Sequence, residues 1–190
     1  MKTIITSSKI LLFATIFTGI IYPLLITLIA QLVFPSGANG SLYFKNGKLL
    51  GSLLLGQNFT DSTYFHPRPS VIDYNPVPSG ASNLGLTSKL LHQQYDERLE
   101  KFLVENNLKS GTVVPSEMLF ASASGVDPHI SKQAAYLQVD RIIKARNFPS
   151  SQNQKIIELI DLSVEYPQFG FLGDEVVNVL KLNIKLDGMR

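Results

Sequence analysis

The chain has 190 residues, of which 45% are hydrophobic and 17% charged, and its mean hydropathy is +0.13. This length allows one membrane segment plus one domain of ordinary size. The absence of cysteine excludes disulfides, thiolate metal sites and cysteine nucleophiles. From residue 35 onward acidic and basic residues balance at 15 each, so the chain lacks the basic surface that nucleic-acid binding needs.

The segment from Ile10 to Phe34 contains no charged residue. As a helix it would be about 37 Å long at ~1.5 Å per residue, enough to cross a hydrocarbon core of about 30 Å. Pro23 would break a soluble helix but is tolerated, with a kink, in a membrane helix. A cleaved signal peptide has a shorter apolar run, although Ala30 and residues 36–38 leave that alternative open. The sequence therefore predicts a transmembrane helix.

The lysines that flank this helix indicate its orientation. Lys2 and Lys9 precede the helix closely, whereas the first cations after it are Lys45 and Lys48. Because positive charge beside a membrane helix favours the cytoplasmic side, we expect the N-terminus inside and the rest of the chain outside.

The expected organisation is a cytoplasmic N-terminus (1–9), a transmembrane helix (10–34) and a single extracytoplasmic domain (35–190). The domain opens with the turn-rich stretch Pro35–Gly40. The apolar run Leu49–Leu55 predicts a short buried strand.

The segment from Gln57 to Leu86 is rich in Pro, Ser, Gly, Asn and Tyr and has no helical period. A structureless stretch of this length inside a domain is typical of a functional or partner-contacting surface. Ser79, Gly80, Ser82 and Asn83 could form an anion-binding nest from backbone amides and hydroxyls. A tight loop of turn-forming residues explains the same four positions.

Three helices are predicted after this segment. The first begins near Ser88 and ends at Asn106 and Asn107. A second starts at Ser131, a good N-cap, and has cations near its C-terminal end. A third begins with a capping box formed by Ser151 and Gln154. The cations of the second helix are Arg141, Lys144 and Arg146.

The chain ends in a strict alternation of apolar and polar residues, which predicts a half-buried β-strand. Strands with intervening helices place the domain in the α+β class. The inward residues of this expected strand are Leu180, Leu182, Ile184 and Leu186, and the outward ones are Lys181, Asn183 and Lys185.

Asp127-Pro128-His129 is the most catalytic-looking cluster, with Ser122 and Ser124 nearby. A serine hydrolase of the nucleophile-elbow type needs Gly-x-Ser-x-Gly, and Ser124 lacks both glycines. The structural alternative makes Asp127 a turn residue and Ser131 a cap, with His129 hydrogen-bonded at a helix start.

Metal binding and nucleotide hydrolysis find little support. The three histidines do not form an i, i+4 pair on a helix, as many zinc sites do. Gly47-Lys48 lacks the earlier glycine and the following hydroxyl of a phosphate-binding P-loop. We therefore expect no metal site and no ATP turnover by this chain alone.

Several segments together resemble the C subunit of the bacterial Kdp potassium-pumping ATPases in order and spacing, and the resemblance runs from the anchor almost to the C-terminus. Where that family often has a double glycine, this chain has Gly80-Ala81. The matching segments are Gly56–Phe59, Tyr64–Ser70, Tyr74–Asn75, Ser79–Gly85, Ala121–Ser131, Gln138–Arg141, Gly170–Gly173 and Val177–Leu180.

The resemblance implies a non-catalytic subunit of a high-affinity potassium uptake complex in the bacterial plasma membrane. Its partners would be a channel-like A subunit, a P-type ATPase B subunit, a very small F subunit and the lipid bilayer. Potassium would be the transported ion. Members of the family are described as catalytic chaperones that raise the ATP affinity of the B subunit, so ATP is a possible ligand. A membrane-anchored enzyme and a solute-binding module remain alternatives.

We expect the residues of the resembling segments to organise loops for partner contact. They are Gln57, Phe59, Arg68, Pro69, Ser70, Tyr74, Ser79, Gly80, Ser82, Asn83, Gly85, Ser122, Ser124, Gly125, Asp127, His129, Gln138, Arg141 and Asn178.

Overall fold

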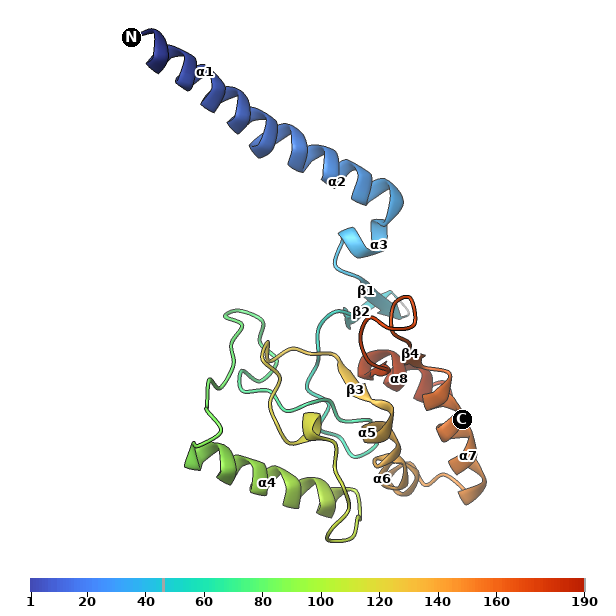
Figure 1. Cartoon of the computed structure of the whole chain (residues 1–190). Helices are drawn as coiled ribbons and strands as arrows, with labels where there is room; N and C mark the ends of the chain where they lie inside the picture. The colour runs from blue at the N-terminus through green and yellow to red at the C-terminus, as the bar shows by residue number, and fades with distance from the viewer. Residues whose placement is uncertain (46, 190) are drawn as a thin grey trace. The chain divides into compact units, whose positions relative to one another are not determined.

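The computed structural model describes residues 1–45 and 47–189 (Figure 1). The chain divides into two compact units, Met1–Ser52 and Leu53–Arg190. This division does not test where a membrane would begin and end, so the predicted boundaries of the transmembrane helix stay predictions.

The first unit begins with one apolar helix, as predicted. It consists of α1 (Lys2–Ile16), a π-helical turn (Phe17–Ile21) and α2 (Tyr22–Val33), and none of its residues is buried. The 32 residues from Lys2 to Val33 are long and apolar enough to cross a membrane. Pro23 has no N–H to donate to the preceding turn, and the widened π-helical turn ends at Ile21, two residues before it.

The rest of this unit is a single helical turn, α3 (Pro35–Ala38), and an antiparallel hairpin of β1 (Leu42–Lys45) and β2 (Lys48–Ser52). The predicted strand therefore exists, but the prediction that it is buried is wrong, because Leu49 and Leu50 are exposed. A two-stranded hairpin has no second layer of its own that could cover its apolar side chains.

The second unit is built on a three-stranded antiparallel sheet with the order β3 (His129–Ser131), β5 (Val176–Asn178), β4 (Val164–Glu165). In the middle strand Val177 lies opposite Ile130 on one side and Val164 on the other. The strands are short, so most of the core comes from the helices around them.

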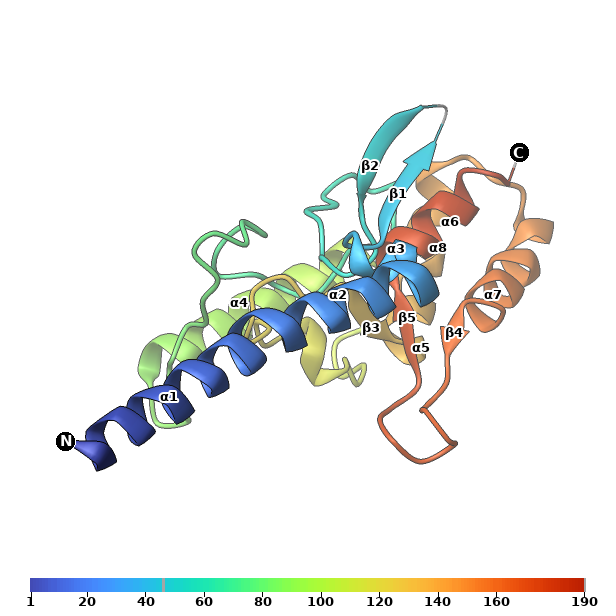
Figure 2. The same ribbon diagram turned by 90° about the horizontal axis from the view of Figure 1, so that it is seen from above.

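Within residues 53–189, five helices complete the unit. The first of them, α4, lies apart from the other four in both ribbon views (Figures 1 and 2). It reaches the core through Phe102, which is buried. The helices are α4 (Lys89–Glu105), α5 (Lys132–Tyr136), α6 (Val139–Ala145), α7 (Asn153–Asp161) and α8 (Val179–Leu186), and 3-10 turns occur at Ser116–Met118 and Ser150–Gln152.

Two predicted helix starts are confirmed by their caps. The Ser88 hydroxyl accepts the Leu91 N–H at the start of α4, and the Ser131 hydroxyl accepts the Ala134 N–H at the start of α5. The second predicted helix is split in two at Gln138, between α5 and α6.

Three local predictions are wrong. The capping box does not form, because a 3-10 turn precedes α7 and no side chain caps that helix. His129 lies on a strand rather than at a helix start.

The terminal strand is the third error, since residues 179–186 form α8. Its buried residues include Val179, Leu182, Asn183 and Leu186, which share one face of a helix at i, i+3, i+4 and i+7. Asn183 was predicted to point outward, yet it is buried. The alternating leucines match the period of a strand, but the buried residues of this segment follow the period of a helix.

Candidate functional site

Residues 53–88, all of them described, form no helix or strand. Their course is fixed instead by contacts with other parts of the unit, among them residues 121–129 and the helices α6 and α8. The segment predicted to make partner contacts is therefore an ordered irregular surface held by a scaffold, as binding loops often are.

An ion pair joins the two segments. Arg68 NH1 lies 2.6 Å from Asp127 Oδ2, and both side chains are about three-quarters buried, at 25% and 28% exposure. Asp127 Oδ1 also accepts the His129 backbone N–H at 3.0 Å, which confirms its role as a turn residue. Burial alone would raise the pKa of Asp127, but hydrogen bonds from His129 and Arg68 lower it to about 2.

Further ionisable side chains lie next to this ion pair. His129 Nδ1 lies 3.6 Å from Asp127 Oδ1 and its Nε2 lies 3.8 Å from Glu165 Oε2. Glu165 Oε1 in turn accepts a hydrogen bond from Lys181 Nζ at 2.6 Å. Because both ring nitrogens face carboxylates, the geometry places no serine nucleophile at His129, and the hydrolase hypothesis gains no support.

Three further hydrogen bonds, two between backbone groups and one from a side chain, reinforce the junction. The Gly56 N–H donates to Val126 O at 2.7 Å, and the Ser122 N–H donates to Pro69 O at 3.2 Å. The Ser79 hydroxyl donates to Ser124 O at 3.0 Å. The structure thus brings together residues 56, 69 and 79 with residues 122–126, as a cluster of loop contacts.

Two glycines make this close approach possible. A Cβ at Gly56 would lie 2.6 Å from Asp127 O, so no other residue fits without moving the backbone. Gly125 has a φ of +72°, and a Cβ there would lie 2.4 Å from Ile72 Cγ1. Both positions require glycine for steric reasons.

Ser70 and Tyr74 shape the turn that follows Arg68. The Ser70 hydroxyl accepts the N–H groups of Ile72 and Tyr74, at 3.2 and 3.0 Å. The Tyr74 hydroxyl donates to Arg68 O. Burial and the nearby Asp73 carboxylate raise the pKa of Tyr74 to about 12, so this hydroxyl keeps its proton and remains a donor.

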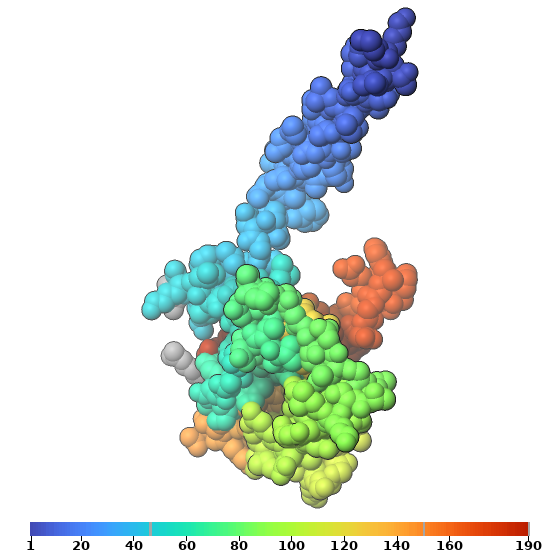
Figure 3. All heavy atoms as spheres, turned by 90° about the vertical axis from the view of Figure 1, so that its left-hand side faces the viewer, coloured from blue at the N-terminus to red at the C-terminus, as the bar shows by residue number. Residues whose placement is uncertain are grey.

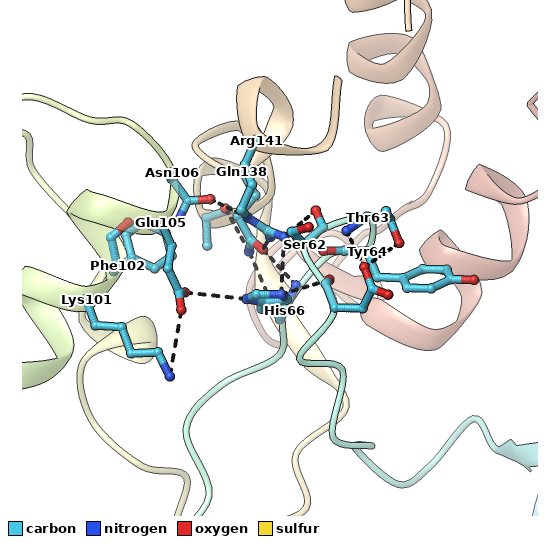
Figure 4. A network of polar contacts seen from close by, with 12 residues as sticks. Ser62, Thr63, Tyr64, His66, Lys101, Phe102, Glu105, Asn106, Gln138 and Arg141 are labelled. Carbon is cyan, nitrogen blue, oxygen red and sulfur yellow. Dashed lines mark hydrogen bonds and ion pairs between the residues drawn. The ribbon is translucent and has the colours of Figure 1, made fainter. Parts of the chain in front are cut away.

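A second group of predicted residues lies inside the unit (Figure 4). Arg141 is only 5% exposed. Its Nε donates to Asn106 Oδ1 at 3.0 Å and its NH2 to Gln138 Oε1 at 2.7 Å. Its NH1 donates to Ser62 O and Tyr64 O at 2.7 and 2.9 Å. Arg141 was expected among cations near a helix end, and it serves instead as a buried link between α6 and residues 62–64.

Two amide side chains hold the next two residues of the same segment. Gln138 Oε1 accepts the His66 N–H at 2.7 Å, while its Nε2 donates to His66 O at 3.2 Å. Asn183 binds Phe65 in the same way, at 2.8 and 3.0 Å. The amides thus replace the partner strand that residues 65 and 66 lack.

Sequence reasoning missed Asn106, Asn183, Glu165 and Lys181. Asn106 was taken as the end of a helix, which it is, but its buried oxygen also receives Arg141. Asn183 was misplaced because its segment was assigned to a strand. Glu165 and Lys181 lie 16 positions apart, and no local pattern links them.

Asn178 and Phe59 have supporting roles. The Asn178 oxygen caps α8 by accepting the Lys181 N–H at 3.1 Å, and its Nδ2 donates to Leu53 O at 2.7 Å. Phe59 packs against the core and against the ring of Tyr64, whose centroid is 5.7 Å away.

The remaining predicted positions stand apart from these clusters. Ser82, Asn83 and Gly85 are exposed, and Gln57 is half-buried. Asn83 has a left-handed φ of 52°, which fits the tight-loop alternative for the predicted anion nest.

A cavity of about 300 Å³ lies beside the inner network. Its lining includes Phe59, Tyr74 and Phe102 and charged side chains of both signs, namely Asp73, Arg98, Lys101 and Glu105. The loop from Ser79 to Gly85 does not line it. Among residues 1–45 and 47–189 no group of three or more His, Asp or Glu side chains is placed to hold a metal ion.

The family model described as "K+-transporting ATPase, c chain" matches residues 4–188. The chain belongs to the KdpC family. It is 43% identical over 187 residues to the potassium-transporting ATPase KdpC subunit of Photorhabdus laumondii, covering 97% of this chain and 95% of that protein. It is 41% identical over 188 residues to the KdpC subunit of Mycobacterium tuberculosis, covering 98% of each.

The KdpC subunit of Caldanaerobacter subterraneus is 40% identical over 178 residues, or 94% of this chain and 91% of that protein. As a member of the KdpC family, the chain is an accessory subunit of a potassium-transporting ATPase complex and is associated with a membrane. The long apolar helix from Lys2 to Val33 fits that association.

Proposed function

We propose that this KdpC-family chain is a non-catalytic subunit whose domain lies outside the plasma membrane and binds the other subunits through its irregular loop surface. The partners are the channel-like A subunit, the P-type ATPase B subunit and the small F subunit. The domain caps the external potassium entrance of the channel-like subunit. Lys2 and Lys9, which lie near the N-terminal end of the apolar helix and precede its uncharged part, support the orientation.

The observation that carries the proposal is that hydrogen bonds to other parts of the unit hold residues 53–88 in an ordered conformation. Arg68, Ser79 and Gly56 tie this segment to residues 121–129, while Val77 and Leu86 are exposed. A loop surface that is already ordered loses little conformational entropy on binding, which favours protein contact. Apolar side chains on such a surface supply contact area.

A role in raising ATP affinity is the alternative that the family resemblance implies. It requires the loop from Ser79 to Gly85 to meet nucleotide in the cytoplasm. In the proposed orientation this loop follows the only predicted membrane span and lies on the other side, so it contacts neither the nucleotide nor the nucleotide-binding part of the ATPase subunit.

The test uses the assembled complex. Leu86→Asp and Val77→Asp place a charge on the proposed contact surface, and Val113→Asp is the matched control, because Val113 is equally exposed in another loop. We expect the first two variants to reduce both copurification of the other subunits and growth at low external potassium. Circular dichroism checks that each variant folds. Normal assembly and growth with both variants would contradict the proposal.

A further inference from the structure

A cluster of exposed apolar side chains occupies the loop between β4 and β5, outside the surface discussed above. We call this cluster the aromatic tip, and it consists of Tyr166, Phe169, Phe171 and Leu172. Phe169 and Phe171 are 86% and 74% exposed. In the space-filling view of Figure 3 the orange-red segment that carries the tip projects from the surface.

The tip is an ordered turn. The Gln168 N–H donates to Leu172 O at 3.1 Å, and the Leu172 N–H donates back to Gln168 O at 3.0 Å. Between them Phe169 and Gly170 both have left-handed φ angles, of 55° and 80°. Glycine adopts that conformation freely, whereas a bulky aromatic residue does so with strain.

A strained residue that is also exposed to water contributes nothing to the core of its own unit. Strain of this kind gathers at binding sites, where the surrounding structure holds a side chain in position for a ligand. Phe169 fits this pattern, because the hydrogen-bonded pair of Gln168 and Leu172 fixes the turn that presents it. The tip is therefore shaped for contact with another molecule.

The charges around the tip select the kind of partner. From Ile156 to Leu180 the sequence has five acidic residues and no lysine or arginine. Asp174 and Glu175 follow the tip after Gly173 and are exposed, whereas Glu165, which precedes the tip, is paired with Lys181. A membrane surface with anionic lipids attracts basic segments and repels acidic ones. A protein pocket with a basic rim is complementary to this arrangement.

We propose that the aromatic tip inserts into an apolar pocket, rimmed by lysine or arginine, on another subunit of the transport complex. Phe169 and Phe171 are the anchors, since buried aromatic side chains supply much of the binding energy of protein interfaces. Asp174 and Glu175 pair with the basic rim. The inference rests on the proposed contact-making role and adds a second surface to it.

Photocrosslinking identifies the neighbour of the tip. p-Benzoylphenylalanine at position 169 keeps an aromatic side chain there, and the complex is irradiated in native membranes. We expect an adduct with another subunit, mapped to a peptide that contains lysine or arginine. The same label at position 162 is the control, because Leu162 is 81% exposed at the end of α7 and lies outside the tip. Adducts with lipid alone, or no adduct, would overturn the proposal.

A substitution separates binding from folding. Phe169→Gly relieves the left-handed strain, so we expect an unchanged or higher melting temperature for the chain but at least tenfold faster release from the purified complex. A purely structural role for Phe169 would instead lower the melting temperature. The control is Leu162→Ser, because glycine at the end of a helix would have effects of its own. Release of the Phe169→Gly chain no faster than release of the Leu162→Ser chain would contradict the inference.

The two proposals fail separately. Complex assembly with Leu86→Asp reports on the loop surface of the proposed function, whereas the adduct at position 169 reports on the tip alone. Reversal of the two acidic charges that follow the tip, by Asp174→Lys with Glu175→Lys, gives a further check. We expect it to speed release of the chain at low salt and to change it less at high salt, where charge interactions are screened.

Discussion

Arg141 places a positive charge inside the second unit, and the oxygens that receive its hydrogen bonds are neutral. They belong to Ser62, Tyr64, Asn106 and Gln138. Burial lowers the pKa of Arg141 to about 10, so the side chain stays charged at neutral pH. Its planar group satisfies oxygens in several directions at once, which a lysine ammonium on a flexible stem does not reproduce.

Arg141→Lys should therefore lower the free energy of unfolding by about 2–4 kcal/mol, because buried acceptors lose their donors. Denaturant unfolding of the full chain in detergent, followed by circular dichroism, measures this. Lys144→Met on the same helix is the control, since Lys144 is exposed and its loss should cost little. Equal stability of the Arg141→Lys variant and the unaltered chain would show that the network does not support the fold.

Asp127 gives a pH-dependent prediction. Its pKa is about 2 in the folded chain, below the value of about 3.9 for an unfolded aspartate. A lowered pKa stabilises the fold above about pH 4, and this contribution disappears as the pH falls through 2. Asp127→Asn should thus cost roughly 2 kcal/mol at pH 6 and much less near pH 2. Unfolding at both pH values measures the difference, and a cost independent of pH would contradict the assigned ion pair.

At the scale of elements, local signals were sufficient for α4 and α5. Ser88 and Ser131 cap these helices with their own hydroxyls, and such a bond depends on residues three positions away. The end of the chain was different, because the alternating leucines of residues 180–186 fit a strand, and only tertiary burial of Asn183 and its neighbours selects the helix.

The candidate site was predictable as a set of residues but not as an arrangement. Arg68 and Asp127 lie 59 positions apart, and no spacing rule joins them. The resemblance to a family identified both residues as candidates without showing that they form an ion pair. Gln138 and Arg141 came from the same resemblance, and only the structure distinguishes their buried role from that of the surface loops.

The junction between loops gives an element-scale prediction. Gly56→Ala should lower the free energy of unfolding by about 1–3 kcal/mol, because the new Cβ would collide with the Asp127 carbonyl. Gly85→Ala is the matched control, since a Cβ there meets nothing within 4 Å. Thermal unfolding of both variants compares them. A Gly56→Ala variant as stable as Gly85→Ala would mean that the two segments are not packed this closely.

At the scale of the whole molecule, the chain has a long apolar helix, whose lysines Lys2 and Lys9 lie near its N-terminal end, and a unit rich in ordered loops. This unit, residues 53–190, has 15 acidic and 13 basic residues, so it carries no excess of positive charge that would draw it to nucleic acid. Membership of the KdpC family makes it an accessory subunit of a potassium-transporting ATPase. Which side of the membrane the unit occupies decides whether it meets the potassium entrance or the nucleotide.

Determining the side of the membrane on which the domain lies is therefore the most direct test of the proposed function. The chain has no cysteine, so Lys155→Cys on the exposed face of α7 creates a single reactive thiol. Thr3→Cys, before the apolar segment, is the control expected in the cytoplasm. Intact cells are treated with a membrane-impermeant maleimide, before and after permeabilisation. We predict that position 155 is labelled in intact cells and position 3 only after permeabilisation, whereas the reverse pattern would place the domain in the cytoplasm and contradict the proposed role.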